Sequence, residues 1–196
     1  MIAVITGEII NSTNVEPQHW QLKLQMLFES RLADASKWAI YKENYFLVEI
    51  TSKEALELVI LIKSLIKHIE RLDVRMSIGL GKPGFTSDLV TESNGQAFTH
   101  SREAFETMRN KTLCIKTPSK DFDLYFNPML NLVNFIASQW KPATAETIFY
   151  RLLNKDKMQK QIAELLNKDN TTVNKALKRG AYEQITEVLV VYKEKV

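Results

Sequence analysis

Residues 159–178 read QKQIAELLNKDNTTVNKALK, and this stretch decides the C-terminal part of the fold. Apolar residues recur at the offsets that two short crossing helices need, at Ile162, Leu166, Val173 and Leu177. Ala163 is small enough for close approach of the second helix, and Asn167 tolerates the left-handed backbone angles of a tight turn. Asp169 is a strong N-cap. The spacing predicts a helix-turn-helix at about residues 157–180.

The outer face of the second helix indicates what this motif contacts. Short hydrogen-bonding groups come first and basic groups later, at Asn170, Thr171, Thr172, Asn174, Lys175, Lys178 and Arg179. This order suits a helix that enters the DNA major groove N-terminus first, with its cations on phosphates. We expect Gln159 and Lys160 to contact the DNA backbone from the first helix. The predicted partner is double-stranded DNA; a plain helical hairpin that docks another protein is the alternative.

The charge distribution supports the same partner. The chain carries a net charge of +3, and residues 155–196, with nine Lys/Arg and six Asp/Glu, account for all of it. Positive charge is what nucleic acid requires, but this excess is modest. We therefore expect one copy to bind weakly and a homodimer to be the binding form.

Upstream of this motif, strands and helices alternate. The predicted strands are Ile2–Ile5, Trp38–Tyr41, Tyr45–Ile50, Val74–Ile78 and Thr112–Lys116. A first helix contains Trp20 and Leu24, a second follows a capping box at Thr51 and Glu54, and a third runs to about Met108. This order predicts an α+β sandwich of ferredoxin-like type.

The rest of the chain is predicted to be helical. Helices are expected over Pro128–Trp140, Thr144–Asn154, Lys157–Leu166 and Thr171–Tyr192. The change in character predicts two domains, an α+β domain over 1–126 and an all-α domain over 127–196 that carries the helix-turn-helix.

Composition excludes several classes of protein. The single cysteine, Cys114, rules out an intramolecular disulfide, and the three histidines lie far apart, which argues against a structural zinc site. The first residues, MIAVITGE, lack the basic start of a signal peptide, so we expect none, and no apolar run is long enough to span a membrane. We expect a cytoplasmic protein that does not insert into membranes.

Several segments of the first domain resemble class III nucleotide cyclases. Residues 4–13, VITGEIINST, are similar to the first strand and phosphate-binding turn of that family. Residues 42–47, KENYFL, fall on its hairpin, 74–81, VRMSIGLG, on its arginine-containing strand, and 95–103, GQAFTHSRE, on its later helix. The resemblance implies a nucleotide with Mg²⁺ as ligand, with Glu8 at a metal-binding aspartate and Asn11, Ser12 and Thr13 on the phosphate turn.

The departures from the cyclase pattern bear on activity. Asn44 stands at the second metal-binding aspartate, Thr99 at the ribose-contacting asparagine, and Glu103 at the arginine that stabilises the transition state. Two anionic ligands are needed to hold a pair of divalent ions on a triphosphate, and one glutamate with one amide holds them poorly. The resemblance therefore favours a degenerate domain that senses a nucleotide or holds a dimer. A nucleotide-processing enzyme is the alternative.

Over nearly its full length, the combination of a cyclase-like half and a helix-turn-helix resembles the SatD family of bacterial proteins. This resemblance implies the two-part architecture. Together with the C-terminal motif, it leads us to expect a DNA-binding transcriptional regulator.

Overall fold

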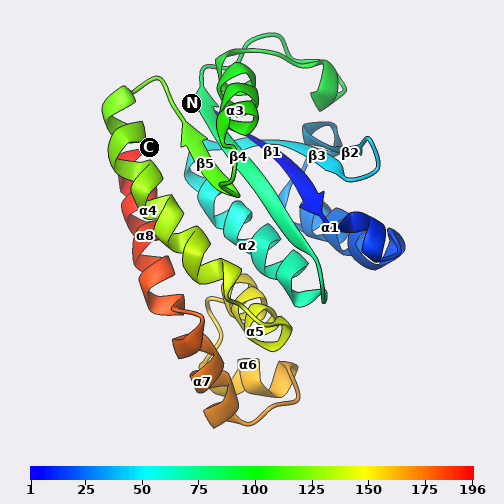
Figure 1. Cartoon of the computed structure of the whole chain (residues 1–196), viewed down its shortest axis with the longest axis vertical. Coiled ribbons are helices and arrows are strands. Elements are labelled where there is room, and N and C mark those ends of the chain that lie inside the picture. The colour runs from blue at the N-terminus through cyan, green and yellow to red at the C-terminus, as the bar shows by residue number, and fades with distance from the viewer.

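A five-stranded mixed sheet forms the centre of the computed structural model, which describes the whole chain, Met1–Val196 (Figure 1). The strands are β1 (Ile2–Ile10), β2 (Trp38–Tyr41), β3 (Tyr45–Thr51), β4 (Asp73–Gly81) and β5 (Leu113–Lys116). Their order is β2-β3-β1-β4-β5; β1 is antiparallel to β3 and β4, and β5 is parallel to β4. All five predicted strands are confirmed, and β1 and β4 are longer than predicted.

Helices cover both faces of this sheet. One face packs against α2 (Ala55–His68), which itself contacts α1 (Gln18–Arg31), and the other packs against α3 (Gln96–Thr107). The α3 backbone lies so close to β4 that a Cβ atom on Gly79 would be 2.2 Å from the Ala97 carbonyl oxygen. The Ser101 hydroxyl lies 2.7 Å from the Thr6 hydroxyl across this contact. The glycine is therefore required by the packing of α3 on the sheet.

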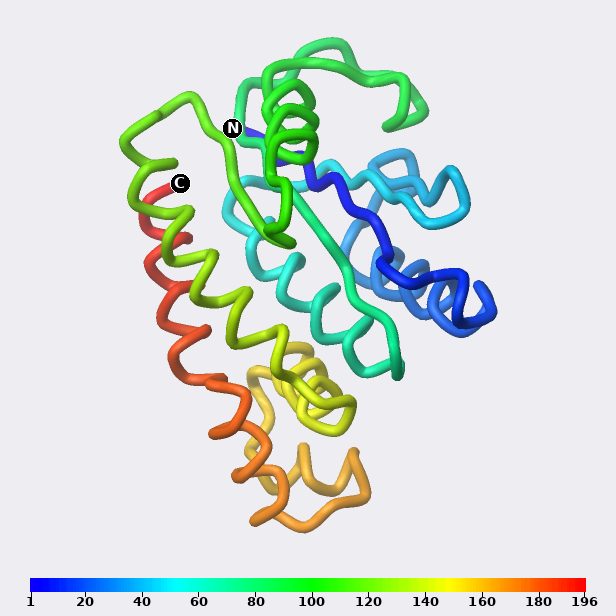
Figure 2. The backbone as a smooth tube through the Cα atoms, viewed as in Figure 1, coloured from blue at the N-terminus to red at the C-terminus, as the bar shows by residue number.

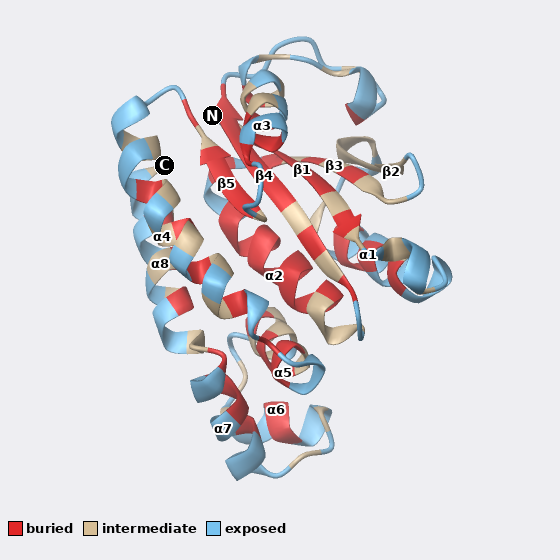
Figure 3. Cartoon of the chain, in the orientation of Figure 1, coloured by how far each residue is buried: buried red, intermediate tan, exposed pale blue.

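The α2 helix is buried all round, from Ala55 to Ile66 (Figure 3). Leu58 and Ile62 are at most 1% exposed, and so are Leu56, Ile60 and Leu61 on other sides of the helix. A helix that is hydrophobic all round must be covered all round, and here α5 and α8 cover the side away from the sheet. The predicted capping box did not form, since the Thr51 hydroxyl donates to the Glu54 carboxylate (2.5 Å) and accepts no hydrogen bond from the backbone N–H groups of the first turn.

Five helices make up the rest of the chain. They are α4 (Lys120–Ser138), α5 (Pro142–Leu153), α6 (Gln159–Leu165), α7 (Asn170–Arg179) and α8 (Tyr182–Lys195). In Figures 1 and 2, α8 runs beside α4 in the opposite direction, so the C-terminus lies near the start of α4. None of the helices combines the length and apolar character needed to cross a membrane.

Two predicted helix boundaries were wrong. α4 begins at Lys120, eight residues before Pro128, so the proline lies inside the helix. The helix begins there because Ser119 is its N-cap, and the Ser119 side chain accepts a hydrogen bond from the Phe122 N–H. The predicted helix over Thr171–Tyr192 is broken, because Ala181 adopts a left-handed conformation (φ 53°). The Gly180 carbonyl at this break accepts a hydrogen bond from the Trp140 indole (3.1 Å).

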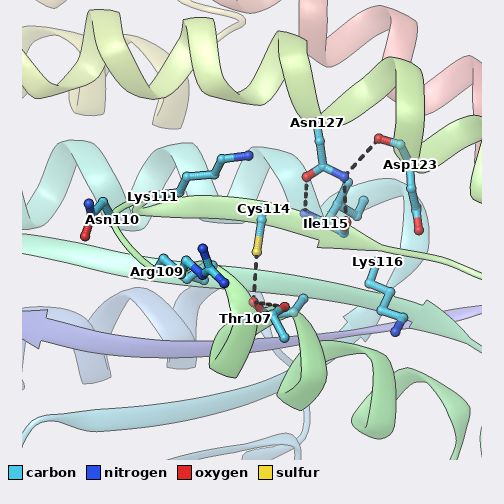
Figure 4. Close-up of a pocket in the computed structure, with 11 residues that line it drawn as sticks. Thr107, Arg109, Asn110, Lys111, Cys114, Ile115, Lys116, Asp123 and Asn127 are labelled. Atoms are coloured by element: carbon cyan, nitrogen blue, oxygen red, sulfur yellow. Dashed lines mark hydrogen bonds between the residues drawn. The ribbon is translucent and has the colours of Figure 1, made fainter.

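The outer edge of β5 is closed by a side chain from α4 (Figure 4). Asn127 accepts from the Ile115 N–H (3.0 Å) and donates to the Ile115 carbonyl (2.9 Å). Its amide thereby makes the two bonds that a further strand would make, which protects the edge from pairing with another chain.

One hydrophobic core of 41 buried residues runs from the sheet into α7 and α8. It includes Ile5 of β1, Leu61 of α2, Ile148 of α5 and Val173 of α7. The predicted boundary at residues 126 and 127 falls inside α4. The division into two domains stays a prediction, and the two parts share this core.

Candidate nucleic-acid interface

Residues 159–178, predicted to form a helix-turn-helix, fold as two short helices, α6 and α7, joined by a four-residue turn. Asn167 has the left-handed conformation expected of it, with φ at 51°. Asp169 is the N-cap of α7 and accepts from the Thr172 N–H (2.8 Å). The apolar anchors Ile162 and Val173 are fully buried, and Ala163 is 4% exposed. The turn, the cap and the anchors are therefore confirmed as local structure.

The outer face of α7 is exposed along its whole length. The exposed residues are those predicted to contact DNA, namely Asn170, Thr171, Thr172, Asn174, Lys175, Lys178 and Arg179. The Thr172 hydroxyl also donates to the Asp169 carboxylate (2.5 Å), so it belongs to the cap as well as to the outer face. This bond and the Thr172 N–H keep the pKa of Asp169 below its ordinary value, so the cap stays ionised.

The basic residues of this face have no acidic partners. Lys175, Lys178 and Arg179 on α7, and Lys160 on α6, form no ion pair within the chain. Gln159 is half-buried, and its amide donates to the Asn170 carbonyl at the start of α7 (3.4 Å). The four cations are therefore free to bind an external anion, whereas Gln159 mainly joins the two helices.

Other basic residues of the C-terminal segment have acidic partners. Lys168, in the turn between α6 and α7, pairs with Glu146 of α5 (2.5 Å). Lys155 and Lys193 both pair with Glu57 of α2, at 2.5 and 2.8 Å. Lys155 and Lys193 attach the C-terminal helices to α2, and Lys168 attaches the turn between α6 and α7 to α5. All three cations contribute little to an external anion site.

A polar hollow of about 450 Å³ lies beside α7. Its lining includes Gln159, Asn174 and Lys178, and also Arg151 of α5, which was not among the predicted site residues. The Arg151 guanidinium lies 5.6 Å from the centre of the Tyr182 ring and donates to the Asn154 carbonyl (2.9 Å). Arg151 comes from outside the predicted motif, so only the fold reveals that it lies beside Lys178.

The N-terminal candidate, Glu8, lies in a cluster on the α3 side of the sheet. Its carboxylate is 3.7 Å from Nε of Arg75, whose guanidinium stacks on the Phe105 ring at 4.4 Å. Arg75 also donates to the Phe105 carbonyl (2.9 Å). Burial and the Glu8 charge raise the pKa of Tyr45, which is opposite Glu8 in the sheet. Glu8 thus has a cationic partner inside the chain.

The predicted phosphate turn follows directly after β1. Asn11 has a left-handed backbone (φ 62°) and donates to the Arg71 carbonyl (3.2 Å), while Ser12 and Thr13 begin a short 3-10 turn. Asn44, at the second metal-ligand position, donates to the Ile9 carbonyl (3.1 Å). The structure brings these residues to one end of β1, with the amides of Asn11 and Asn44 engaged in backbone bonds.

The cyclase-like positions on α3 also have local partners. Thr99 donates to the Gly95 carbonyl (3.2 Å). Glu103 pairs with Lys116 of β5 at 2.6 Å, and this hydrogen bond lowers the pKa of Glu103. No hydrogen bond or ion pair joins Thr99 or Glu103 to Glu8.

A hollow of about 590 Å³ lies between the end of α3, β5 and α4 (Figure 4). Arg109 and Lys111 line it, together with Cys114. Burial raises the pKa of the Cys114 thiol to about 12, so this cysteine is protonated at neutral pH and is not a nucleophile. Cys114 packs against Ala104 and Phe105 of α3 in a small buried cluster.

The fold and the candidate interface define a mixed α+β protein with a C-terminal pair of short helices that exposes unpaired cations. The chain belongs to the SatD family, whose family model matches residues 1–185. No curated protein and no solved structure matches the chain.

Proposed function

We propose that this protein is a DNA-binding regulator and that α6 and α7 are its helix-turn-helix. The observation that carries the proposal is the outer face of α7, which is exposed and polar from Asn170 to Arg179, with its cations unpaired. In this proposal, α7 lies in the major groove. Asn170, Thr171 and Asn174 then reach base edges, while Lys175, Lys178 and Arg179 contact phosphates.

Two further observations support this placement. The α6 cation Lys160 is unpaired, which suits a phosphate contact from the first helix. The hollow lined by Arg151 and Lys178 offers two cationic side chains to the DNA backbone beside α7. A groove-binding helix is positioned by such backbone contacts, and its specificity comes from contacts with bases.

For the N-terminal part, we propose a ferredoxin-like, cyclase-like domain that serves as a sensor or dimerisation platform. The order β1-α1-β2-β3-α2-β4, with the antiparallel arrangement β2-β3-β1-β4, supports this assignment. Catalysis on a nucleotide is the weaker candidate, since Glu8 pairs with Arg75 and Asn44 bonds the backbone. A nucleotide with Mg²⁺ bound here would have to compete with Arg75 for Glu8.

The proposal is tested by binding to random-sequence duplex DNA over a salt titration. The wild-type protein is expected to bind with an affinity that falls steeply as salt rises, because phosphate contacts release counterions. Changing Lys175, Lys178 and Arg179 together to Ala removes up to three of these cations per copy. The slope of log K against log salt should then fall in magnitude by about 0.9 for each phosphate that is no longer neutralised.

A charge-matched control separates this interface from net charge. Lys23, Lys53 and Lys120 are also exposed and unpaired, and they lie outside α6 and α7. Their triple change to Ala alters the net charge equally and should leave the slope near that of the wild type. Equal slopes for the α7 variant and the wild type would refute the proposal. No binding by the wild type at low salt would favour a protein-docking role for α6 and α7.

A further inference from the structure

The solvent-facing side of α4 carries a long apolar band. Every exposed residue from Leu124 to Phe135 is apolar, and the set is Leu124, Tyr125, Pro128, Leu132 and Phe135. We call these five residues the α4 stripe. At 100° per residue they fall within about 100° of the helix circumference, so they form one continuous band. No Asp, Glu, Lys or Arg occurs between Leu124 and Ser138.

The exposure of this band is large for a surface in contact with water. Leu124, Tyr125, Leu132 and Phe135 are 68, 72, 66 and 66% exposed. Together they present on the order of 500 Å² of apolar surface, compared with about 800 Å² per partner in a standard interface. Val190 and Val191 of the neighbouring α8 are also exposed, at 51 and 39%. Depletion of charge and enrichment in aromatic residues are typical of interface cores.

The stripe is complementary to itself when the helix direction is reversed. Reversal about residue 130 exchanges Tyr125 with Phe135 and Pro128 with Leu132, and it places Leu124 opposite Ile136, which is apolar and half-buried. An aromatic ring therefore lies at each end of the band, about 15 Å apart along the helix at 1.5 Å per residue. Such a pairing suits a two-fold interface, in which the same patch serves both partners.

We propose that the α4 stripe is the interface of a homodimer, in which α4 packs antiparallel against α4 of a second copy with Tyr125 facing Phe135. An apolar groove of about 180 Å³ between α4 and α8, lined by Met129, Leu132 and Val188 among others, receives a side chain from the partner. The inference specifies the surface for the dimer included in the proposed function, and it can be tested without DNA.

The proposed pairing has a consequence for α7. In space, α7 lies beyond the C-terminal end of α4 (Figures 1 and 2). An antiparallel α4 pair therefore carries one α7 near each of its ends. Two recognition helices related by a two-fold axis match a palindromic DNA site, and the separation of its half-sites reports the geometry of the dimer.

Sedimentation equilibrium of the full-length protein tests the interface. We expect the wild type to dimerise and the variant Leu132→Glu/Phe135→Glu to dimerise at least about 100-fold more weakly, because each change places a charge in the interface. The matched control is Leu22→Glu/Met26→Glu on α1, where both residues are 59% exposed. This control should dimerise like the wild type. Thermal unfolding should confirm that both variants are folded.

The register is tested by cysteine cross-linking in a Cys114→Ala background. Mixing a Tyr125→Cys copy with a Phe135→Cys copy should yield a disulfide-linked dimer, and neither variant alone should cross-link efficiently. Strong self-linking of Tyr125→Cys would overturn the antiparallel register.

Three outcomes would overturn the interface itself. They are a wild type that is monomeric at 100-fold the concentrations used for DNA binding, a dimer that persists in the α4 variant, and a monomeric wild type that sediments with phospholipid vesicles. The last would assign the stripe to a membrane surface. DNA binding through α7 is measured separately. The α4 interface can therefore be refuted while DNA binding is supported, and DNA binding can be refuted while the α4 interface is supported.

Discussion

Replacing Glu57 by Gln should weaken the attachment of the helical segment to the α+β part. Glu57 is buried in α2 with only 4% of its surface exposed, and cations from three other segments reach it. Arg31 of α1 lies 2.9 Å away, Lys155 before α6 lies 2.5 Å away, and Lys193 of α8 lies 2.8 Å away. A neutral side chain would leave these cations without their shared partner.

The magnitude follows from the pKa of this carboxyl. Burial alone would raise the pKa of Glu57, but the hydrogen bonds and charges of Lys155 and Lys193 outweigh burial and lower it from 4.5 to about 2. At 1.36 kcal/mol per unit, the ionised form contributes about 3 kcal/mol to the free energy of unfolding. Because the folded pKa is depressed, this contribution is complete well above pH 4.5 and is lost as the pH falls through 2.

Urea unfolding of the wild type and Glu57→Gln at several pH values checks both the size and the sign. At pH 7 the variant should be less stable by about 3 kcal/mol, and by pH 3 the difference should have fallen by about half. Glu194→Gln, an exposed and unpaired acid on α8, is the control and should stay within about 0.5 kcal/mol of the wild type. A loss below 1 kcal/mol, or a difference that does not change between pH 7 and pH 3, would refute the electrostatic reasoning.

Two further predictions concern the packing of the sheet. Gly79→Ala should destabilise the protein by about 3 kcal/mol or more, because the new methyl group would collide with the α3 backbone, which cannot rotate away. Thermal unfolding measures this loss, and a variant as stable as the wild type would contradict the close packing of α3. Asn127→Ala should cost about 1–3 kcal/mol, because it leaves the outer edge of β5 without its two backbone bonds. Hydrogen exchange at the Ile115 amide should accelerate, and unchanged exchange would show that this edge is not closed by Asn127.

Much of the fold follows from the sequence because the local signals are strong. The strands β2 and β3 were predicted from their apolar runs. The breaks in helices were harder, since Pro128 favours a helix start, but the Ser119 cap precedes it. The turn at Ala181 has no local signal of its own, because alanine rarely adopts a left-handed conformation. There the packing of Gly180 and Trp140 determines the backbone.

The role of α2 shows what periodicity alone misses. Its sequence, ALELVILIKSLIKH, is apolar on every side, which indicates a helix covered on every side. The predicted division after residue 126 rests on the change to an all-helical pattern, and that pattern does not reveal that later helices pack on α2. Leu56, Ile60 and Leu61 carried the signal that helices from the later segment pack on α2.

The candidate interface was predictable residue by residue, but the electrostatics of its surroundings were not. Cap, turn and outer face are short-range features, so the sequence of residues 159–178 specifies them. Arg151 and the partners of Lys155, Lys168 and Lys193 depend on contacts between distant segments. Ion pairs between distant segments can be identified only once the three-dimensional fold is known.

These pairings change the expected strength of DNA binding. The C-terminal segment, residues 155–196, has nine basic and six acidic residues. Of the basic ones, Lys155, Lys168 and Lys193 are already neutralised by acids of α2 and α5. Without Arg151, the four unpaired cations of α6 and α7 would give one copy a salt slope of about −4, and two copies bound together a slope of about −7. A monomeric α4 variant should therefore show about half the wild-type slope. If the slope stays near the wild-type value when the protein no longer dimerises, then DNA binding does not depend on pairing through α4.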